Sequence, residues 1–285
     1  RRQRQMCIRD RVGGGRSRMF GRWERLTVLG KPVGWETDAG VPARGGPDGE
    51  VILGTGELFL SRTDVSLPSR GGVGFSFVRY YRSHVDYDGP LGPGWDHNGN
   101  QRIVGREEGG QLTQLVWLTG SGAIRFELSG GEWKPEPGAF YRLQMQDKLI
   151  FIERDDGVRL EFEPAANQPV ASPRWRIARI ASRHDQWKAN GMRFQYRPGS
   201  DLLEIVEDPF GNKVRFYHDE NGRLRAVHAA DLLVLYDYDP MGRLKKVTTP
   251  RVALGLSQAQ DSAWEYRYVG GLRHWLQAEI PPVSY

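Results

Sequence analysis

The segment FYHDENGRLRAV at residues 216–227 is followed by YDYDPMGRLKKV at residues 236–247, and the two share one pattern. Alignment of their Gly-Arg-Leu triplets places Phe216 opposite Tyr236, and Gly222 opposite Gly242. Internal repetition with a fixed spacing of this kind is the sequence signature of stacked supersecondary units. These two segments therefore predict an array in which each unit rests on its neighbour.

The same pattern extends in both directions to about four units. Each unit has aromatic residues at positions i and i+2, with His218 replacing the second one in one unit, and then a leucine that starts a second segment. The spacing of these leucines is nearly constant except before the last one, where a loop rich in Ser, Gln, Ala and Asp lengthens the interval. The aromatic segments are residues 194–196, 216–218, 236–238 and 264–266, and the leucines are Leu203, Leu224, Leu244 and Leu272.

Each unit is expected to form a strand, a turn and a returning strand. Rings at i and i+2 lie on one face of a strand, because side chains alternate between the two faces. In the two middle units an Asp-x-x-Gly sequence supplies the turn, since Asp can bond its own backbone and Gly can take a positive φ. A lone hairpin is marginal, so the units should stack. The repeat-defining residues are Tyr196, Leu203, Phe216, Asp219, Gly222, Leu224, Tyr236, Tyr238, Asp239, Gly242, Leu244, Trp264, Tyr266 and Leu272.

Short strands are also predicted upstream of the repeats, and the predicted fold class is all-β. Residues 148–153 and 158–163 form the clearest hairpin, with an Asp-Gly turn between them. Gly and Pro number 36 and 17, a content typical of many short elements joined by turns. Residues 175–187 fit either a helix, by the spacing of Ile177 and Trp187, or a strand.

The net charge of +5 and the isoelectric point near 9.3 originate in the N-terminal segment, at positions 1–20. That segment holds seven arginines and one aspartate, and the rest of the chain carries almost equal numbers of basic and acidic side chains. A basic surface that binds nucleic acid is therefore not expected on the folded part. The chain also has no apolar run near the roughly 18 residues that a membrane helix needs, so no membrane span is predicted.

Residues 1–48 are expected to form an irregular head. The string MCIRDR near the start resembles one translated frame of a transposase adapter used in sequencing libraries, so residues 1–11 are interpreted as an assembly scar. The alternative is a basic, disordered N-terminal arm. The only cysteine, Cys7, lies in this segment, so disulfides and Cys-ligated zinc are not expected in the fold. Residues 12–49 are expected to be loops with one strand at residues 25–29.

The unit that contains Tyr238, Asp239 and Gly242 resembles the YD repeat of the Rhs (rearrangement hotspot) family, which also occurs in insecticidal toxin-complex shells and teneurins. Four segments upstream resemble, in family order, the domain of unknown function that opens the repeat region of Rhs proteins. The resemblance covers about residues 49–281. The upstream segments are GTGELFL (54–60), TDVSLP (63–68), RYYRS (79–83) and GPLGPGWDHN (89–98), and their defining residues are Gly56, Asp64, Pro68, Tyr81, Gly92, Gly94 and Trp95.

The resemblance implies antiparallel β-hairpin repeats that wind into part of a hollow β-sheet shell, a cocoon around a C-terminal polymorphic toxin. The implied role is structural: the shell encapsulates the toxin and helps to deliver it in bacterial competition, for example by type VI secretion. The implied partners are the rest of the shell, the toxin and secretion-spike proteins, and the implied location is outside the bacterial cell or on its surface. The implied divisions are residues 1–48 for the head, 49–116 for the shell-opening domain, 117–190 for connecting hairpins and 191–285 for repeats.

The chain departs from the family pattern in three ways. It stops after about four repeats, has no toxin and has no complete aspartyl self-cleavage segment, so we expect an N-terminal shell fragment. Two Asp-Pro-x-Gly sequences, which begin at Asp208 and Asp239, share the core of that cleavage segment. Both lie inside repeats, where they are expected to make turns. The last repeat should leave an unpaired edge, so the fragment is expected to be marginally stable or to self-associate.

No cofactor, metal or catalytic residue is predicted. The six histidines lack metal-binding spacing, no Gly-x-Ser-x-Gly elbow occurs, and paired carboxylates such as Asp155-Asp156 lie in turns. A calcium-loop pattern needs Gly at position 6, where this chain has Gln101. The chain is therefore not expected to be an enzyme. The residues at positions 1, 3, 5 and 12 of that loop pattern are Asp96, Asn98, Asn100 and Glu107.

The nine Trp and eleven Tyr residues have two interpretations. They can pack in the core and along the inner wall, or their rings can stack on sugars. The second interpretation makes the chain a carbohydrate-binding adhesion module of the bacterial surface, with Trp264 and Tyr266 as the candidate contacts to a glycan. A third, a glycan-cleaving enzyme, has only scattered carboxylates in its favour. The first two interpretations differ in whether the rings are exposed.

Overall fold

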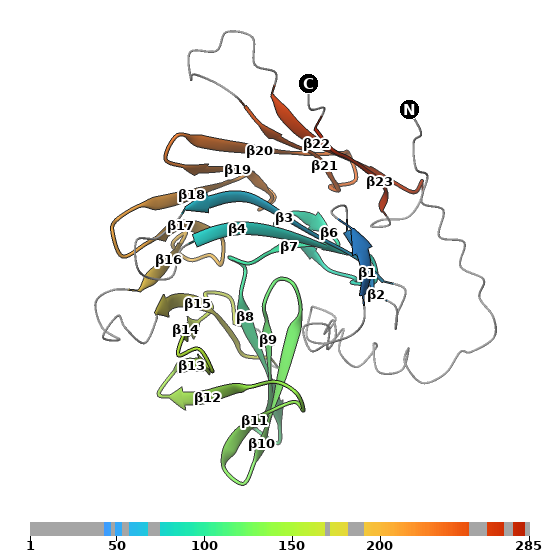
Figure 1. Cartoon of the computed structure of the whole chain (residues 1–285). Coiled ribbons are helices and arrows are strands. Elements are labelled where there is room, and N and C mark those ends of the chain that lie inside the picture. Colours follow the sequence, from blue (N-terminus) through green and yellow to red (C-terminus); the bar gives the residue numbers. More distant parts are fainter. Residues whose placement is uncertain are drawn as a thin grey trace, which may run out of the picture.

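The computed structural model of this chain is all-β in the part that it describes, as the sequence predicted (Figure 1). The predicted strand at residues 25–29 and the adapter-like segment lie outside that part. None of the described residues forms a helix long and apolar enough to cross a membrane. The described residues are 43–46, 49–52, 57–67, 75–168, 172–181, 191–250, 261–270 and 276–282.

Five strands near the N-terminus form one antiparallel sheet, called the small sheet below. Its two long central strands, β3 and β4, pair Leu60 with Tyr81, and a bulge interrupts their register between Thr63 and Val65. Phe75, Phe77, Arg79 and Tyr81 of β4 alternate with half-buried residues and face the core. The order is β1-β2-β3-β4-β7, with β1 at Ala43–Gly46, β2 at Gly49–Ile52, β3 at Glu57–Leu67, β4 at Phe75–Arg82 and β7 at Trp95–His97.

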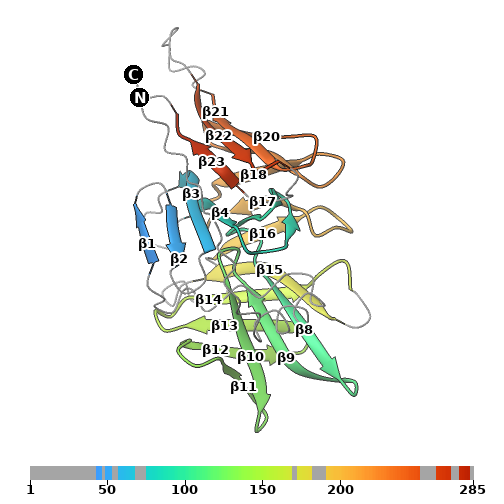
Figure 2. The ribbon, with the colours of Figure 1, turned by 90° about the vertical axis from the view of Figure 1, so that its right-hand side faces the viewer.

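The repeats form eight consecutive antiparallel strands of a second, larger sheet, called the repeat ladder below. Figure 2 shows these strands stacked one above the other toward β21 and β22. Neighbours in sequence are neighbours in the ladder throughout. The strands are β16 at Met192–Tyr196, β17 at Leu203–Glu207, β18 at Lys213–His218, β19 at Leu224–Ala229, β20 at Leu232–Tyr238, β21 at Leu244–Thr249, β22 at Ser262–Tyr268 and β23 at Leu276–Ile280.

The large sheet branches at β15, which spans Arg174–Ala181. One edge of β15 pairs with β14, while the other edge pairs first with β8 and then with β16. The two branches face each other, because Trp117 lies edge-on to Tyr141 at 5.2 Å and to Phe162 at 6.3 Å. The branches contain β8 at Arg102–Glu108, β9 at Gln111–Leu118, β10 at Ala123–Ser129 and β11 at Glu132–Pro135, and β12 at Tyr141–Gln146, β13 at Leu149–Arg154 and β14 at Arg159–Pro164.

The hairpin predicted at residues 148–163 is confirmed, since Ile152 of β13 pairs with Leu160 of β14. Of the two interpretations of residues 175–187, the strand is correct for the described part, which ends at Ala181. A bulge in β15 opposite the step from Glu161 to Phe162 puts Ile177 and Ile180 on the same face of the strand, and their separation of three residues imitated helical spacing.

The small sheet packs against one face of the repeat ladder, and one continuous apolar cluster joins them (Figure 1). Phe77 of β4 lies 5.4 Å from Phe216 of β18, measured between ring centres. A short two-stranded hairpin, β5 at Asp88–Gly89 and β6 at Gly92–Pro93, lies between β4 and β7 in sequence. This segment, residues 88–94, is called the Gly-Pro hairpin below.

Candidate functional site

Every hairpin of the repeat ladder has the same internal geometry. One aromatic residue points into the core and is at most 6% exposed. The strand register then shifts by one residue, and the residue after this β-bulge pairs with a leucine of the returning strand. The inward residues are Phe194, Phe216, Tyr236 and Tyr266; the residues after the bulge are Tyr196, His218, Tyr238 and Tyr268; the paired leucines are Leu203, Leu224, Leu244 and Leu276.

In three of the four units, the tyrosine after the bulge bonds the unit to the strand or hairpin before it. The Tyr238 hydroxyl donates to the Leu224 carbonyl oxygen at 2.6 Å, and the Tyr268 hydroxyl donates to the Leu244 carbonyl oxygen at 2.7 Å. Tyr196 makes the equivalent bond to the carbonyl of Ile177 in β15 at 2.7 Å. Burial raises the pKa of each of these tyrosines, so the hydroxyls remain donors. This bond gives the second aromatic position of the repeat its chemical role.

The aspartate that follows closes the turn. Asp219 Oδ1 accepts from the backbone N–H of Asn221 at 2.9 Å and of Arg223 at 2.8 Å. Asp239 makes the same pair of bonds to Met241 and Arg243, at 2.9 and 3.0 Å. Gly222 and Gly242 have φ of +77° and +75°, the left-handed conformation that favours glycine. Asp208 closes a third such turn, between β17 and β18.

The fourth unit begins two residues later than the sequence analysis expected. Trp264 and Tyr266 were assigned as its aromatic pair, but the bulge lies between Arg267 and Tyr268, so the pair is Tyr266 and Tyr268. Three aromatic residues alternate along β22, and periodicity alone does not show where the bulge falls. Leu276 takes the place that was given to Leu272, which lies outside the described residues.

The most buried charged side chain among the described residues lies where the small sheet meets the ladder. Arg79 is 0% exposed, and its Nε lies 2.8 Å from Asp64 Oδ2. Asp64 is the extra residue of the β3 bulge, which turns its side chain toward Arg79. Burial would lower the pKa of Arg79, but the carboxylate of Asp64 and the hydroxyl of Tyr266 raise it above its ordinary value. The guanidinium is therefore a permanent buried cation with a partner.

Two tyrosines of the ladder complete this network. The Tyr236 hydroxyl donates to Asp64 Oδ2 at 2.8 Å, and Arg79 Nη1 donates to the Tyr266 hydroxyl. The Arg79 guanidinium also lies over the rings of Trp95 and Tyr266, 5.3 Å from each centroid. The hydroxyls of the inward residues of the third and fourth units are thus held by polar groups. Phe77 packs edge-on against the rings of both Phe216, at 5.4 Å, and Tyr236, at 6.4 Å, so the hydroxyl contacts are what set the third unit apart from the second.

Further contacts tie the last hairpin to the small sheet. Trp95 Nε1 donates to the Tyr268 hydroxyl at 2.9 Å, and the Leu276 backbone N–H donates to the Tyr81 hydroxyl at 2.9 Å. Arg62 Nε donates to Glu279 Oε1 at 3.0 Å. Burial raises the pKa of Glu279, and the adjacent Arg62 opposes that shift. The fourth unit therefore has both main-chain and side-chain anchors on the small sheet.

The Gly-Pro hairpin docks on the turns of the repeats. The Pro90 carbonyl accepts from the Leu224 N–H at 2.8 Å and from the Tyr238 hydroxyl at 3.2 Å, and Arg223 pairs with Asp88. Gly92 has φ of +91°, and a Cβ added there would lie 2.6 Å from the Gly242 carbonyl oxygen. Glycine is therefore required at this position both by conformation and by contact.

Family models match both regions. One, described as RHS Repeat, matches residues 218–251, which contain the Asp219 and Asp239 turns. The chain belongs to the Rhs/YD-repeat family. The other model, a domain of unknown function (DUF6531), matches residues 48–125, which include the small sheet from β2 onward and the Gly-Pro hairpin. No curated protein matches the chain.

The residues that the sequence singles out in the domain of unknown function gather where the small sheet meets the repeats. Asp64, Tyr81 and Trp95 bond repeat residues directly, and Gly92 touches a repeat turn. Gly94 has φ of +74° beside the Tyr81 ring. Two other residues singled out in this motif, Gly56 and Pro68, lie outside the described residues.

The calcium-loop residues do not converge in this Rhs chain. Asp96 is buried, and its Oδ1 accepts from the His97 N–H and the Asn100 side chain. Asn98 Oδ1 accepts from the Val78 N–H, and Glu107 is exposed on β8. Within the described ranges, no group of three or more His, Cys, Asp and Glu side chains could hold a metal ion.

The carbohydrate contacts proposed from the sequence are not both accessible. Tyr266 is 3% exposed between Trp95 and Arg79, so its ring cannot stack on a sugar. Trp264 is half-buried, with the Arg62 guanidinium over its ring at 4.7 Å. In this chain the inward aromatic residues pack in the core, which corrects the expectation for Tyr266.

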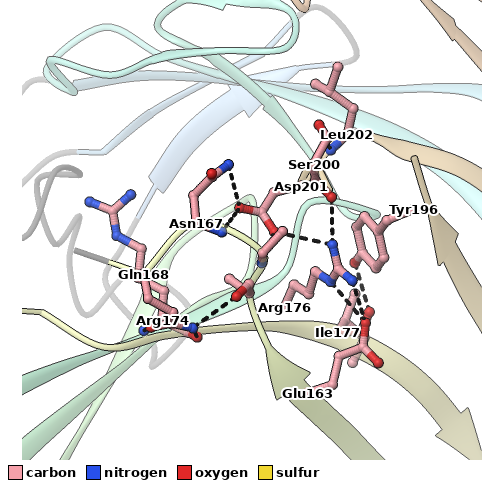
Figure 3. A network of polar contacts seen from close by, with 12 residues as sticks. Glu163, Asn167, Gln168, Arg174, Arg176, Ile177, Tyr196, Ser200, Asp201 and Leu202 are labelled. Atoms are coloured by element: carbon pink, nitrogen blue, oxygen red, sulfur yellow. Dashed lines mark hydrogen bonds and ion pairs between the residues drawn. The ribbon is translucent and has the colours of Figure 1, made fainter. Parts of the chain in front are cut away.

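A second polar network lies on the branch strand β15, and the sequence did not predict it (Figure 3). Arg176 of β15 donates to Glu163 Oε1 at 2.8 Å and to the Ser200 carbonyl at 2.6 Å, and it lies 4.2 Å from the Tyr196 ring centroid. Asp201 also pairs with Arg176, at 3.2 Å. These contacts join β14, β15 and the first Rhs hairpin at the branch point.

Arg79 is the principal site residue that sequence reasoning did not single out. A usable signal existed, because Phe75, Phe77, Arg79 and Tyr81 alternate with period two and place Arg79 on the core face. Glu279 and Arg62 had no comparable signal, since charged residues are ordinarily exposed.

Proposed function

We propose that this chain is a structural part of an Rhs shell that encloses a toxin domain and helps to deliver it outside the bacterial cell. The observation that carries the proposal is the bond from the tyrosine of the third and fourth units to a carbonyl of the preceding hairpin, Tyr238 to Leu224 and Tyr268 to Leu244. A sheet joined in this way can be extended by any number of similar hairpins. The proposed role requires no catalysis by this chain.

Two features support an extended shell rather than a finished sheet. Among the described strands, β23 pairs only with β22, so one edge is open to a further hairpin. Neighbouring strands are each rotated by about 20–25°, so added hairpins would continue the curvature of the ladder. The inward aromatic residues would then form a wall, while exposed residues such as Arg215 and Lys245 would face outward.

The test uses the gene product read from the genomic DNA beyond residue 285. We expect its segment after the last repeat to be digested by protease at least tenfold more slowly than the same segment expressed alone, until the shell is opened with urea. Equal digestion rates in the two contexts would contradict enclosure. Killing of a neighbouring strain in mixed culture, lost when the terminal segment is deleted, would test delivery separately.

A further inference from the structure

The hairpins of the repeat ladder are similar enough to replace one another. A shift of the ladder by one unit along the small sheet would keep an aromatic residue at each inward position and would bring the Asp219 turn to the place of the Asp239 turn. Register in a sheet is specified only where the shifted arrangement loses contacts. The fold therefore needs a feature that distinguishes one unit from the next.

The inward residue supplies that distinction, because the first two units carry Phe194 and Phe216 whereas the last two carry Tyr236 and Tyr266. We propose that the small sheet and the Gly-Pro hairpin act as a template that places each repeat unit by the presence or absence of this hydroxyl. This assigns a role to the domain of unknown function. It goes beyond the proposed function, since it holds whether or not the shell contains a toxin.

The apolar half of the template receives phenylalanine. Phe77 is 0% exposed and meets the Phe216 ring at 5.4 Å in an edge-on arrangement. The His97 ring is stacked on the same Phe216 ring at 6.3 Å. A tyrosine in the place of Phe216, which is 4% exposed, would add a hydroxyl that needs a hydrogen-bond partner to replace water.

The polar half of the template receives tyrosine. Asp64 accepts from the Tyr236 hydroxyl at 2.8 Å, and Arg79 donates to the Tyr266 hydroxyl. A shift that brought Phe216 to the place of Tyr236 would leave Asp64 without that donor at a site closed to solvent. Removal of one partner of a buried hydrogen bond is unfavourable, because Asp64 would keep only its bonds from Arg79 Nε and could not replace the lost donor by water.

Hydrogen bonds from two main-chain N–H groups fix the positions of the second and fourth units on the template. The Leu224 N–H of the second unit donates to the Pro90 carbonyl at 2.8 Å. The Leu276 N–H of the fourth unit donates to the Tyr81 hydroxyl at 2.9 Å. These two amide protons therefore report directly on whether the units occupy their own positions on the template.

The test is hydrogen–deuterium exchange of the full chain, followed by mass spectrometry, with Tyr236→Phe as the principal variant. It deletes only the inward hydroxyl of the third unit and leaves Tyr238, the other aromatic position at which this unit differs from the second, unchanged. We expect the peptides that contain Leu224 and Leu276 to show two populations, one of which exchanges at least tenfold faster than the wild-type chain. The matched control is Tyr217→Phe, which removes a hydroxyl from the exposed face of β18 and should leave one population.

The exchanged variant Phe216→Tyr/Tyr236→Phe keeps the composition and reverses the order of the two side chains. We expect it to increase the fast population beyond that of Tyr236→Phe. If Tyr236→Phe shows a single population that exchanges within twofold of the wild-type rate, the template proposal is wrong. The Tyr236 hydroxyl would then contribute to packing without setting the position of the unit. If the exchanged variant does not fold, the single variant decides the question.

Discussion

The Tyr238 hydroxyl donates a 2.6 Å hydrogen bond to the carbonyl of Leu224, which belongs to the preceding repeat unit. The bond exists because the β-bulge before Tyr238 offsets the strand by one residue and brings the phenol over the neighbouring hairpin. The same relationship joins Tyr268 to Leu244. The repeat is thus a chemical link between hairpins as well as a packing pattern.

Replacement of Tyr238 by phenylalanine should therefore weaken the ladder. Tyr238→Phe is expected to lower the free energy of unfolding by about 1–2 kcal/mol, because the buried Leu224 carbonyl loses its donor. Urea denaturation followed by tryptophan fluorescence measures this change. Tyr217→Phe, on the exposed face, is the control and should change the value by less than about 0.5 kcal/mol. Equal effects of the two variants would show that the hydrogen bond from Tyr238 to Leu224 does not stabilise the ladder.

His218 should make the ladder sensitive to acid. It stands where other units have tyrosine, and its Nδ1 has no hydrogen-bond partner in the described part of the chain. Burial and then the charge of Arg197 lower its pKa from 6.5 to about 4, against smaller opposing effects of Asp219 and Glu204. Between these pH values the unfolded chain binds a proton that the folded chain does not, so stability falls as the pH falls through that window.

The loss between pH 7 and pH 4 that is due to His218 is expected to be on the order of 3 kcal/mol. His218→Tyr should abolish this component of the pH dependence, as measured by denaturation at several pH values. His228→Tyr, a change at an exposed position of β19, should retain it. Superimposable pH profiles for the wild-type chain and His218→Tyr would be inconsistent with a buried neutral imidazole.

The Gly-Pro hairpin should be intolerant of any side chain at Gly92. Gly92→Ala is expected to cost more than about 2 kcal/mol, because φ is +91° and the new Cβ would lie 2.6 Å from the Gly242 carbonyl oxygen. Gly130→Ala is the matched control, since Gly130 also has a positive φ but nothing within 4 Å of the added Cβ, and should cost about 1 kcal/mol. Thermal melting of both variants compares them; equal shifts would mean that the contact with the repeat turn is absent.

The Arg79–Asp64 pair should be sensitive to loss of one partner. Arg79→Met is expected to destabilise the chain by about 3–5 kcal/mol, because Asp64 would remain as a buried carboxylate without its counterion. Arg106→Met removes one partner of an exposed pair with Glu108 and should change stability by less than about 0.5 kcal/mol. Chemical denaturation distinguishes the two, and a cost below about 1 kcal/mol for Arg79→Met would show that the carboxylate reaches water.

The open edge at β23 should cause association. Multi-angle light scattering is expected to show that mass rises with concentration, because an unpaired strand edge is a template for another chain. Ala278→Lys places a charge on β23 and should reduce the association, whereas Ala226→Lys in the interior strand β19 should not. A monodisperse monomer at all concentrations, with sharp cooperative melting, would contradict this expectation.

The strands, the turn aspartates and the family were accessible from the sequence, because each depends on local chemistry. Alternation of apolar residues defines a strand, and Asp219 closes its turn within four residues of its own position. The start of the fourth unit was not accessible. Trp264, Tyr266 and Tyr268 obey the same alternation, and only pairing with β23 decides which two form the unit.

The sequence by itself determined that this protein is a ladder of antiparallel hairpins, since period-two alternation and recurring Asp-Gly turns act over a few residues. Only the tertiary structure decided what the inward aromatic residues contact. Asp64 and Tyr236 are 172 residues apart along the chain, and a β-bulge directs the Asp64 side chain toward Arg79 and Tyr236. Such a contact depends on the packing of one sheet on another, which the alternation within a single strand does not encode.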